Sequence, residues 1–170
     1  MYRQQAEMLE QVPCSEYSAA LQLSLLHIDL GLIQDPILDI GCGLNCTLVR
    51  HLNAMGFEAM GIDRFSDTSP NCRKADWLEY NYGHKKWGTI VSHLGFTNHF
   101  KHHHLRIDGN YLEYAKKYMQ ILEALKTGGR FYYSPELPFI EEYLDRNRFE
   151  IIHYNTNDAG IQTTVILRKM

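Results

Sequence analysis

Long apolar runs, strong net charge and numerous cysteines are all missing from this sequence. No apolar stretch approaches the ~20 residues that a membrane-spanning helix needs. Residues 1–11 are polar and lack the apolar core of a signal peptide, so we expect a cytoplasmic protein without membrane contact. The formal net charge of -3 gives no bulk attraction to nucleic acid or to an anionic membrane.

Cysteine is scarce as well. The chain has 4 cysteines, and no two of them form a C-x-x-C pair, so a disulfide-stapled fold is not indicated. Free thiols in a reducing cytosol are the expected state. Cys42 and Cys46 with His51 fit no common zinc spacing, and Cys42 stands between two glycines, so we expect no metal site.

Length and periodicity indicate one domain over residues 1–170. Residues 1–34 are expected to form an N-terminal helical cap, with a helix from Ser15 to about Leu30 that Gly31 stops. Residues 35–170 are expected to form the core of the domain.

Within residues 35–170, short apolar runs alternate with helix-like segments. The expected strands cover residues 37–40, 57–63, 73–76, 88–92 and 130–134, and a closing hairpin covers residues 148–156 and 161–169 around a turn at 157–160. The short connection between the second and third strands leaves little room for a crossover helix. This order predicts an α/β, three-layer, Rossmann-like fold: a doubly wound, mostly parallel seven-stranded sheet with a terminal antiparallel hairpin.

Three helices are expected among these strands. One begins at Asn45 or Thr47 and ends at Gly56, and another covers residues 135–147. A long helix capped by Asp108 ends at residues 128–129, and residues 97–110 before it read as an irregular, histidine-rich segment. The buried face of the long helix is expected to carry Leu112, Ala115, Met119, Leu122 and Leu125.

Polar residues and glycines follow the expected first, second and fourth strands. In a doubly wound sheet the ligand lies beyond the carboxyl ends of the strands, so Asp39, Asp63 and Ser92 should meet at one crevice. Gly41-Cys42-Gly43 lets backbone approach a ligand closely and opens a helix N-terminus.

The glycine loop lacks the sequence features of a loop that binds phosphate or a dinucleotide. The third glycine of a dinucleotide fingerprint is replaced by Cys46, and no phosphate-binding loop is present. Asp39 would repel a pyrophosphate but suits positive charge. Asp63 follows Gly43 by 20 residues, where an acid accepts hydrogen bonds from a ribose diol. These residues favour a ribonucleoside with a cationic tail.

Residues 37–52 and 57–63 resemble the class I S-adenosylmethionine-dependent methyltransferases. Their first motif is [DE]-x-G-x-G-x-G; Asp39, Gly41 and Gly43 match it, and Asn45 replaces its third glycine. Asparagine tolerates left-handed backbone better than most residues. The resemblance implies S-adenosylmethionine as cofactor and S-adenosylhomocysteine as product.

The resemblance also implies roles for single residues. The loop from Asp39 to Asn45 would wrap the methionine and ribose portion, Asp63 would bind the ribose hydroxyls, and the residues after the third strand would meet adenine. The full cofactor set expected is Asp39, Gly41, Cys42, Gly43, Asn45, Asp63, Arg64, Asp76, Trp77, Ser92 and His93.

Histidines are the natural bases for methyl transfer to oxygen or nitrogen near neutral pH. We expect His93, His102 and His103 as catalytic candidates, with His93 best placed at the end of a strand. His99 and His104 are further candidates. Phe96, His104 and Tyr133 are expected to contact the substrate.

The acceptor is expected to be a small molecule. The [DNS]-P-P-[YF] motif of amino-methylating nucleic-acid enzymes is absent. Lys85, Lys86, Lys101 and Arg106 form at most a modest basic patch. Nucleic acid and protein acceptors stay open, as does the oligomeric state. Two other readings also stay open: an NAD(P)-binding oxidoreductase, and a catalytically silent methyltransferase-like binding or scaffold subunit.

Overall fold

The computed structural model describes residues 17–66, 69–156 and 161–170. Seven strands of this part form one sheet in the order β3-β2-β1-β4-β5-β7-β6. The strands are β1 Ile37–Ile40, β2 Ala59–Asp63, β3 Cys72–Lys74, β4 Trp87–His93, β5 Leu125–Ser134, β6 Phe149–Thr156 and β7 Ile161–Arg168. The helices are α2 Ala19–Leu25, α3 Thr47–Ala54, α4 Phe96–Leu105, α5 Tyr111–Glu123 and α6 Pro138–Glu141.

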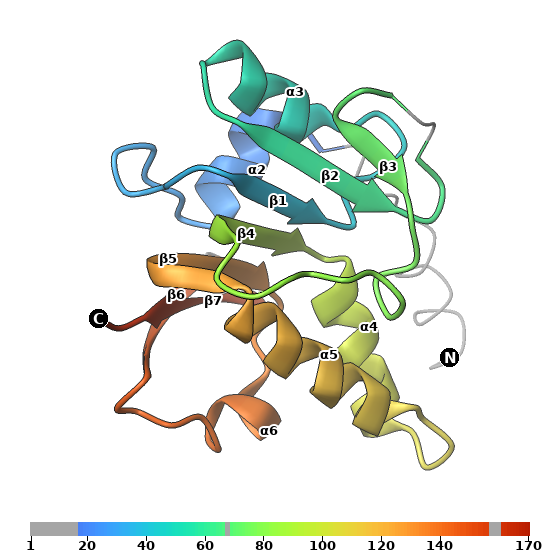
Figure 1. Ribbon diagram of the computed structural model, residues 1–170. Coiled ribbons are helices and arrows are strands. Elements are labelled where there is room, and N and C mark those ends of the chain that lie inside the picture. The colour runs from blue at the N-terminus through green and yellow to red at the C-terminus, as the bar shows by residue number, and fades with distance from the viewer. Residues whose placement is uncertain (1–16, 67–68, 157–160) are drawn as a thin grey trace.

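The sheet has the predicted doubly wound topology. The strands β1 to β5 pair in parallel, whereas β7 is antiparallel to both β5 and β6. From β1 the chain moves outward to β2 and β3, then returns to β4 on the other side of β1 (Figure 1). The topological switch point therefore lies between β1 and β4, where ligands of such sheets bind.

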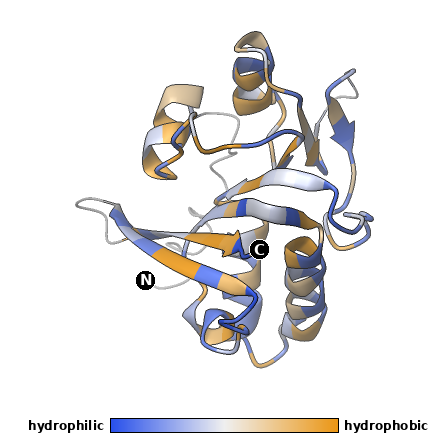
Figure 2. Cartoon of the chain, turned by 60° about the vertical axis from the view of Figure 1, so that its left-hand side comes forward, coloured by the Kyte–Doolittle hydropathy of each residue, from blue (hydrophilic) through white to orange (hydrophobic). Residues whose placement is uncertain are grey.

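Two apolar cores explain why these strands are buried on both sides. One core packs α2 and α3 against the sheet, and the other packs α4 and α5 against its opposite face (Figure 1). All four residues of β1 are buried, as expected for a central parallel strand. Figure 2 shows apolar and polar residues alternating along the helices, the pattern of helices that bury one side.

The long helix is displaced from its predicted position. Asn110, not Asp108, precedes α5, and the helix ends at Glu123, before Gly128 and Gly129, which lie inside β5. Its buried face differs in part: Leu122 is buried as predicted, together with Tyr114, Tyr118 and Ile121, which were not predicted. Leu112 and Met119 are exposed, and Leu125 begins β5. Tyr118 was not among the residues predicted to be buried; its hydroxyl pairs with that of Tyr133, which allows the ring to lie in the core.

Most of the histidine-rich segment is the helix α4, so the prediction of an irregular region was wrong for residues 97–105 and is confirmed only for residues 106–110. Phe96 and Phe100 lie one turn apart on α4 and are both buried, with Thr97 beside them. Two aromatic side chains at this spacing anchor the helix to the core, although the surrounding histidines hide the apolar pattern.

The N-terminal helix is shorter than predicted. The side chain of Ser18 caps α2 by accepting the N–H of Leu21, and the helix ends at Leu25 rather than Leu30. His27 then takes a left-handed conformation, which breaks the helix. The predicted cap, Ser15, lies outside the described residues.

The remaining boundaries shift by a few residues. The third strand is Cys72–Lys74 rather than 73–76, and the fourth begins at Trp87 and includes His93. The helix predicted over 135–147 shrinks to the single turn of α6. Both hairpin strands are confirmed, and the predicted turn at 157–160 lies outside the described residues.

Candidate functional site

The glycine loop after β1 is held against β2 by its backbone. The N–H groups of Gly41 and Cys42 both donate to the carbonyl of Ile62, at 2.8 and 3.1 Å. Gly41 and Gly43 have φ angles of 82° and 76°, which side chains disfavour. A Cβ on Gly41 would also lie 3.2 Å from the Cα of Gly95, because the ends of β1 and β4 are close together.

The end of this loop is left-handed at a residue other than the one predicted. Asn45 is exposed and is not among the described residues with positive φ. Cys46, the N-cap of α3, adopts φ 48° instead. The left-handed residue therefore lies one position closer to the helix than Asn45.

Asp63 joins the end of β2 to the glycine loop. Its Oδ2 accepts the N–H of Gly43 at 3.1 Å, and its Oδ1 accepts the N–H of Phe65 at 2.8 Å. An ionised carboxylate has about four lone-pair sites, so each oxygen can accept a further hydrogen bond. Asp63 thus fixes the loop and can still accept hydrogen bonds from a diol.

Asp39 is a buried acid at the same edge of the sheet. Its side chain is 3% exposed, and burial together with the charge of Asp63 raises its pKa to about 7. A cationic group beside Asp39 would favour the ionised form and reverse this shift. The acid is therefore suited to a positively charged ligand.

Two buried polar side chains end β4. Ser92 is fully buried, and its hydroxyl has no hydrogen-bond partner among the described residues. Such an unsatisfied group costs about 1–3 kcal/mol, so a ligand partner would recover stability here. His93 is 3% exposed and burial lowers its pKa to about 4, which keeps it neutral at pH 7; its ring meets that of Tyr17 edge-on at 5.1 Å.

The segment after β3 brings an indole ring to the glycine loop. A Cβ on Gly41 would lie 3.4 Å from the Trp77 ring, and the Arg64 guanidinium lies 5.0 Å from the centre of that ring. The Trp77 Nε1–H donates to the Tyr114 hydroxyl at 3.4 Å. The neighbouring Asp76 accepts the N–H of Leu78 in a tight turn. Most of the residues predicted to bind cofactor thus converge at the ends of β1, β2 and β4.

The histidine triplet lies elsewhere than predicted. His102, His103 and His104 occupy the last turn of α4, at the end remote from β4, and not a loop before the long helix. The Nδ1 of His103 accepts the N–H of Asn110, and burial is the main cause that lowers its pKa. The ring of His104 stacks on Phe139 at 3.7 Å.

Two residues predicted to contact substrate lie wholly in the core. Phe96 and Tyr133 are both fully buried. The Tyr133 hydroxyl donates to Oε1 of Glu141 at 2.6 Å and pairs with the Tyr118 hydroxyl at 2.9 Å. Sequence reasoning missed Glu141, because nothing in the local sequence indicates that this glutamate will be buried.

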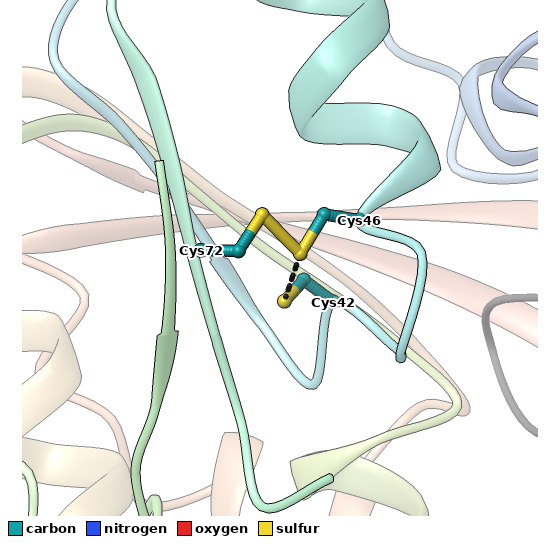
Figure 3. A group of neighbouring side chains, drawn as sticks. All are labelled: Cys42, Cys46 and Cys72. Carbon is teal, nitrogen blue, oxygen red and sulfur yellow. Dashed lines mark hydrogen bonds between the residues drawn. A yellow bond between two sulfur atoms is a disulfide. The ribbon is translucent and has the colours of Figure 1, made fainter. Parts of the chain in front are cut away.

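The expectation of free thiols is wrong for two of the cysteines. Cys46 and Cys72 form a disulfide across a sequence separation of 26 residues. Gly61 pairs with Cys72, so β3 carries this cysteine next to the glycine loop, which sequence spacing could not reveal. Cys42 completes a group of three buried sulfurs (Figure 3), and His51 of the set considered from sequence is exposed on α3.

Comparison with solved structures relates this geometry to known proteins. A TehB-like S-adenosylmethionine-dependent methyltransferase from Corynebacterium glutamicum matches with a TM-score of 0.59 and 18% identity, over 99% of this chain and 96% of that chain. The fold is that of the class I S-adenosylmethionine-dependent methyltransferases. No family model matches the chain, and a search of curated proteins finds no match.

Other proteins with this methyltransferase fold act on very different molecules. A phosphoethanolamine N-methyltransferase from Haemonchus contortus, bound to phosphomonomethylethanolamine and S-adenosylhomocysteine, matches with a TM-score of 0.58 and 12% identity, over 89% of this chain and 53% of that chain. A 16S rRNA N2 G1207 methyltransferase from T. thermophilus, bound to AdoMet and guanosine, matches with a TM-score of 0.54 and 14% identity, over 88% of this chain and 39% of that chain. The methyltransferase fold therefore leaves the acceptor open. The helices within residues 17–66, 69–156 and 161–170 are all too short or too polar to span a bilayer.

Proposed function

We propose that this chain is an S-adenosylmethionine-dependent methyltransferase. The observation that carries the proposal is the pair of acids, Asp39 and Asp63, beside a glycine loop with positive φ angles at the switch point of the sheet. The unsatisfied hydroxyl of Ser92 at the same edge adds a polar group in need of a partner. Burial and the charge of Asp63 already raise the pKa of Asp39, and a pyrophosphate beside it would add further repulsion, which counts against NAD(P).

The residues present fit this cofactor. Asp63 would accept the ribose hydroxyls, and the loop from Gly41 to Asn45 would follow the ribose and methionine portion. Asp39 would favour the cationic methionine end, while Asp76 and Trp77 would lie beside adenine. When bound, S-adenosylmethionine supplies an electrophilic methyl group on a positively charged sulfur.

His93 is the proposed contact to the methyl acceptor. Its low pKa keeps the imidazole neutral, so a ring nitrogen can accept a hydrogen bond from an acceptor O–H or N–H. The protein would thereby hold the acceptor atom in line with the methyl group, which is the main requirement of such a displacement. The acceptor proton becomes acidic as the methyl group adds, so even a weak base can take it. His102 and His103 stay predictions as alternative bases.

A small-molecule acceptor remains our proposal. The formal net charge of -3 and the absence of the nucleic-acid motif support it, and the fold does not decide it. The cytoplasmic location and the single domain also stay predictions. A silent binding or scaffold subunit is the alternative, motivated by Asn45 at the position of the family's third glycine.

Methyl transfer into a cell extract tests the proposal. We expect the purified protein to label one fraction of the extract from methyl-labelled S-adenosylmethionine, and an Asp63→Asn variant to lose this labelling. A small-molecule acceptor predicts that the label passes through a membrane that retains macromolecules. Cofactor binding without labelling of any fraction would favour the silent subunit.

A further inference from the structure

Three buried sulfur atoms meet beneath the glycine loop (Figure 3). Cys42 lies in the loop after β1, Cys46 is the N-cap of α3, and Cys72 is the first residue of β3. Their exposed fractions are 4%, 1% and 3%, and their Sγ atoms all lie within 4.8 Å of one another. Cys42 Sγ is 3.2 Å from Cys46 Sγ, which is itself bonded to Cys72.

The neighbouring backbone makes room for this arrangement. A Cβ on Gly61 would lie 2.6 Å from both Cβ and Sγ of Cys42, so only glycine at this position of β2 admits the Cys42 side chain. The disulfide joins the proposed cofactor loop to β3, the strand that leads to Asp76 and Trp77. One covalent bond therefore connects the two segments expected to hold opposite ends of the cofactor.

We propose that Cys42, Cys46 and Cys72 form a thiol–disulfide switch that sets the affinity of the cofactor site, with Cys42 as the exchanging thiol. This inference rests on the proposed function for its regulatory effect. The disulfide holds the loop and β3 in the arrangement that binds cofactor, so its loss adds an ordering cost to binding.

The exchange step balances without an outside oxidant. The Cys42 thiolate attacks Cys46 Sγ, a Cys42–Cys46 bond forms and the Cys46–Cys72 bond breaks. The leaving Cys72 thiolate takes up the proton that Cys42 released. Full reduction needs a dithiol: its two thiols are oxidised to a disulfide, while Cys46 and Cys72 each gain a proton and one of the two electrons.

The bonding of the sulfur atoms favours this chemistry over a metal site. Cys46 and Cys72 are joined to each other, so of the three residues only Cys42 carries a thiol that could bind a metal ion. The group also contains only three sulfur ligands from the described residues, whereas structural zinc sites use four ligands.

Disulfide mapping tests the exchange. All proteins would carry Cys14→Ser, since Cys14 lies outside the described residues and could otherwise confuse the map. After equilibration with oxidised and reduced glutathione and alkylation, we expect Cys46–Cys72 with a minor Cys42–Cys46 product. A Cys72→Ser variant should form Cys42–Cys46, and a Cys42→Ser variant only Cys46–Cys72. The absence of a Cys42–Cys46 bond in every protein would overturn the exchange, as would zinc bound by three reduced cysteines.

Calorimetry tests the regulation. We expect the affinity for S-adenosylmethionine to fall by at least about fivefold when dithiothreitol reduces the protein, the lower end of typical site-to-site coupling, and to return on reoxidation. A variant with both Cys42→Ser and Cys46→Ser keeps only one of the three thiols, so it can form no disulfide within the group and should bind equally with and without reductant. Circular dichroism checks that each form is folded.

The outcomes separate the two proposals. Equal affinity in both redox states of the parent protein would overturn the switch and leave the methyltransferase function standing. No binding in either state would overturn the proposed function and the regulatory effect with it, while the disulfide map would still decide the exchange.

Discussion

At the scale of single residues, the proposed cofactor site depends on two acids with different environments. Asp63 is already engaged by two backbone N–H groups, whereas Asp39 is buried with a pKa raised to about 7. The first residue fixes the loop and the second responds to the charge of the ligand. Each therefore makes a distinct prediction.

Asp39 predicts that cofactor binding depends on pH. Because its pKa is raised, the folded protein without ligand holds the proton up to about pH 7, and the ionised form that suits a cation appears only above it. We expect the affinity for S-adenosylmethionine to increase by up to about tenfold between pH 6 and pH 8. In calorimetry across this range, an Asp39→Asn variant should bind weakly and without this dependence. A parent protein that binds equally across the range would contradict the role of Asp39.

The raised pKa of Asp39 also predicts that the free energy of unfolding depends on pH. Folded Asp39 binds its proton more tightly than the unfolded chain does, so its contribution to the free energy of unfolding falls as pH rises from about 4 to about 7. Thermal unfolding of the ligand-free protein at pH 8 should therefore show that Asp39→Asn is more stable than the parent. Lower stability of this variant at pH 8 would argue that Asp39 is paired in the folded state.

The role proposed for Asp63 predicts that an Asp63→Asn variant loses affinity for S-adenosylmethionine. Replacing it by Asn removes charged acceptors for the ribose diol, each worth about 1.5–3 kcal/mol, so affinity should fall by at least about tenfold. Asp145→Asn is the matched control, because Asp145 also accepts a backbone N–H but in an exposed turn. Equal behaviour of the two variants in calorimetry would remove Asp63 from the cofactor site.

The role proposed for His93 predicts that a change at this residue affects turnover but not the binding of S-adenosylmethionine. A histidine that contacts the acceptor should lower turnover by about 100-fold when changed to Ala, while the dissociation constant of S-adenosylmethionine stays nearly constant. His102→Ala, on the last turn of α4, is the comparison. Equal losses of turnover and cofactor affinity in His93→Ala would make His93 a cofactor residue instead.

At the scale of elements, periodicity predicted the strands better than the helices. The run of residues 37–40 was predicted as a strand because a buried parallel strand is apolar throughout. The helix α4 was missed because only Phe96 and Phe100 mark its buried side. The face of α5 was misassigned because Tyr118 satisfies its hydroxyl inside the core through Tyr133, a contact that no local pattern contains.

The buried hydrogen bonds of Tyr133 with Tyr118 and Glu141 are expected to stabilise the packing of β5 against α5 and α6. Tyr133→Phe leaves Glu141 with the N–H of Leu137 but without the tyrosine hydroxyl, and should cost about 1–2 kcal/mol of unfolding free energy. Urea unfolding measures this cost. A variant of unchanged stability that loses activity toward the acceptor would instead support the predicted substrate role of Tyr133.

At the scale of the whole molecule, the fold was predictable from sequence, and so was the edge of the sheet at which the candidate residues lie. Alternating strands and helices imply a parallel sheet, and the sheet brings Asp39, Asp63 and Ser92 to one edge. The disulfide was not predictable, because Cys46 and Cys72 meet only through the pairing of β2 with β3. Local patterns indicate where the strands lie, whereas such pairings depend on the assembled sheet.

Calorimetric titration of the unmodified protein with S-adenosylmethionine, S-adenosylhomocysteine and NAD tests the central claim most directly. We expect both sulfur nucleosides to bind with one site per chain, and S-adenosylmethionine to gain from its extra positive charge beside Asp39. NAD should give no heat of binding, since its pyrophosphate would face that acid. Binding of NAD without a response to either sulfur nucleoside would contradict the account.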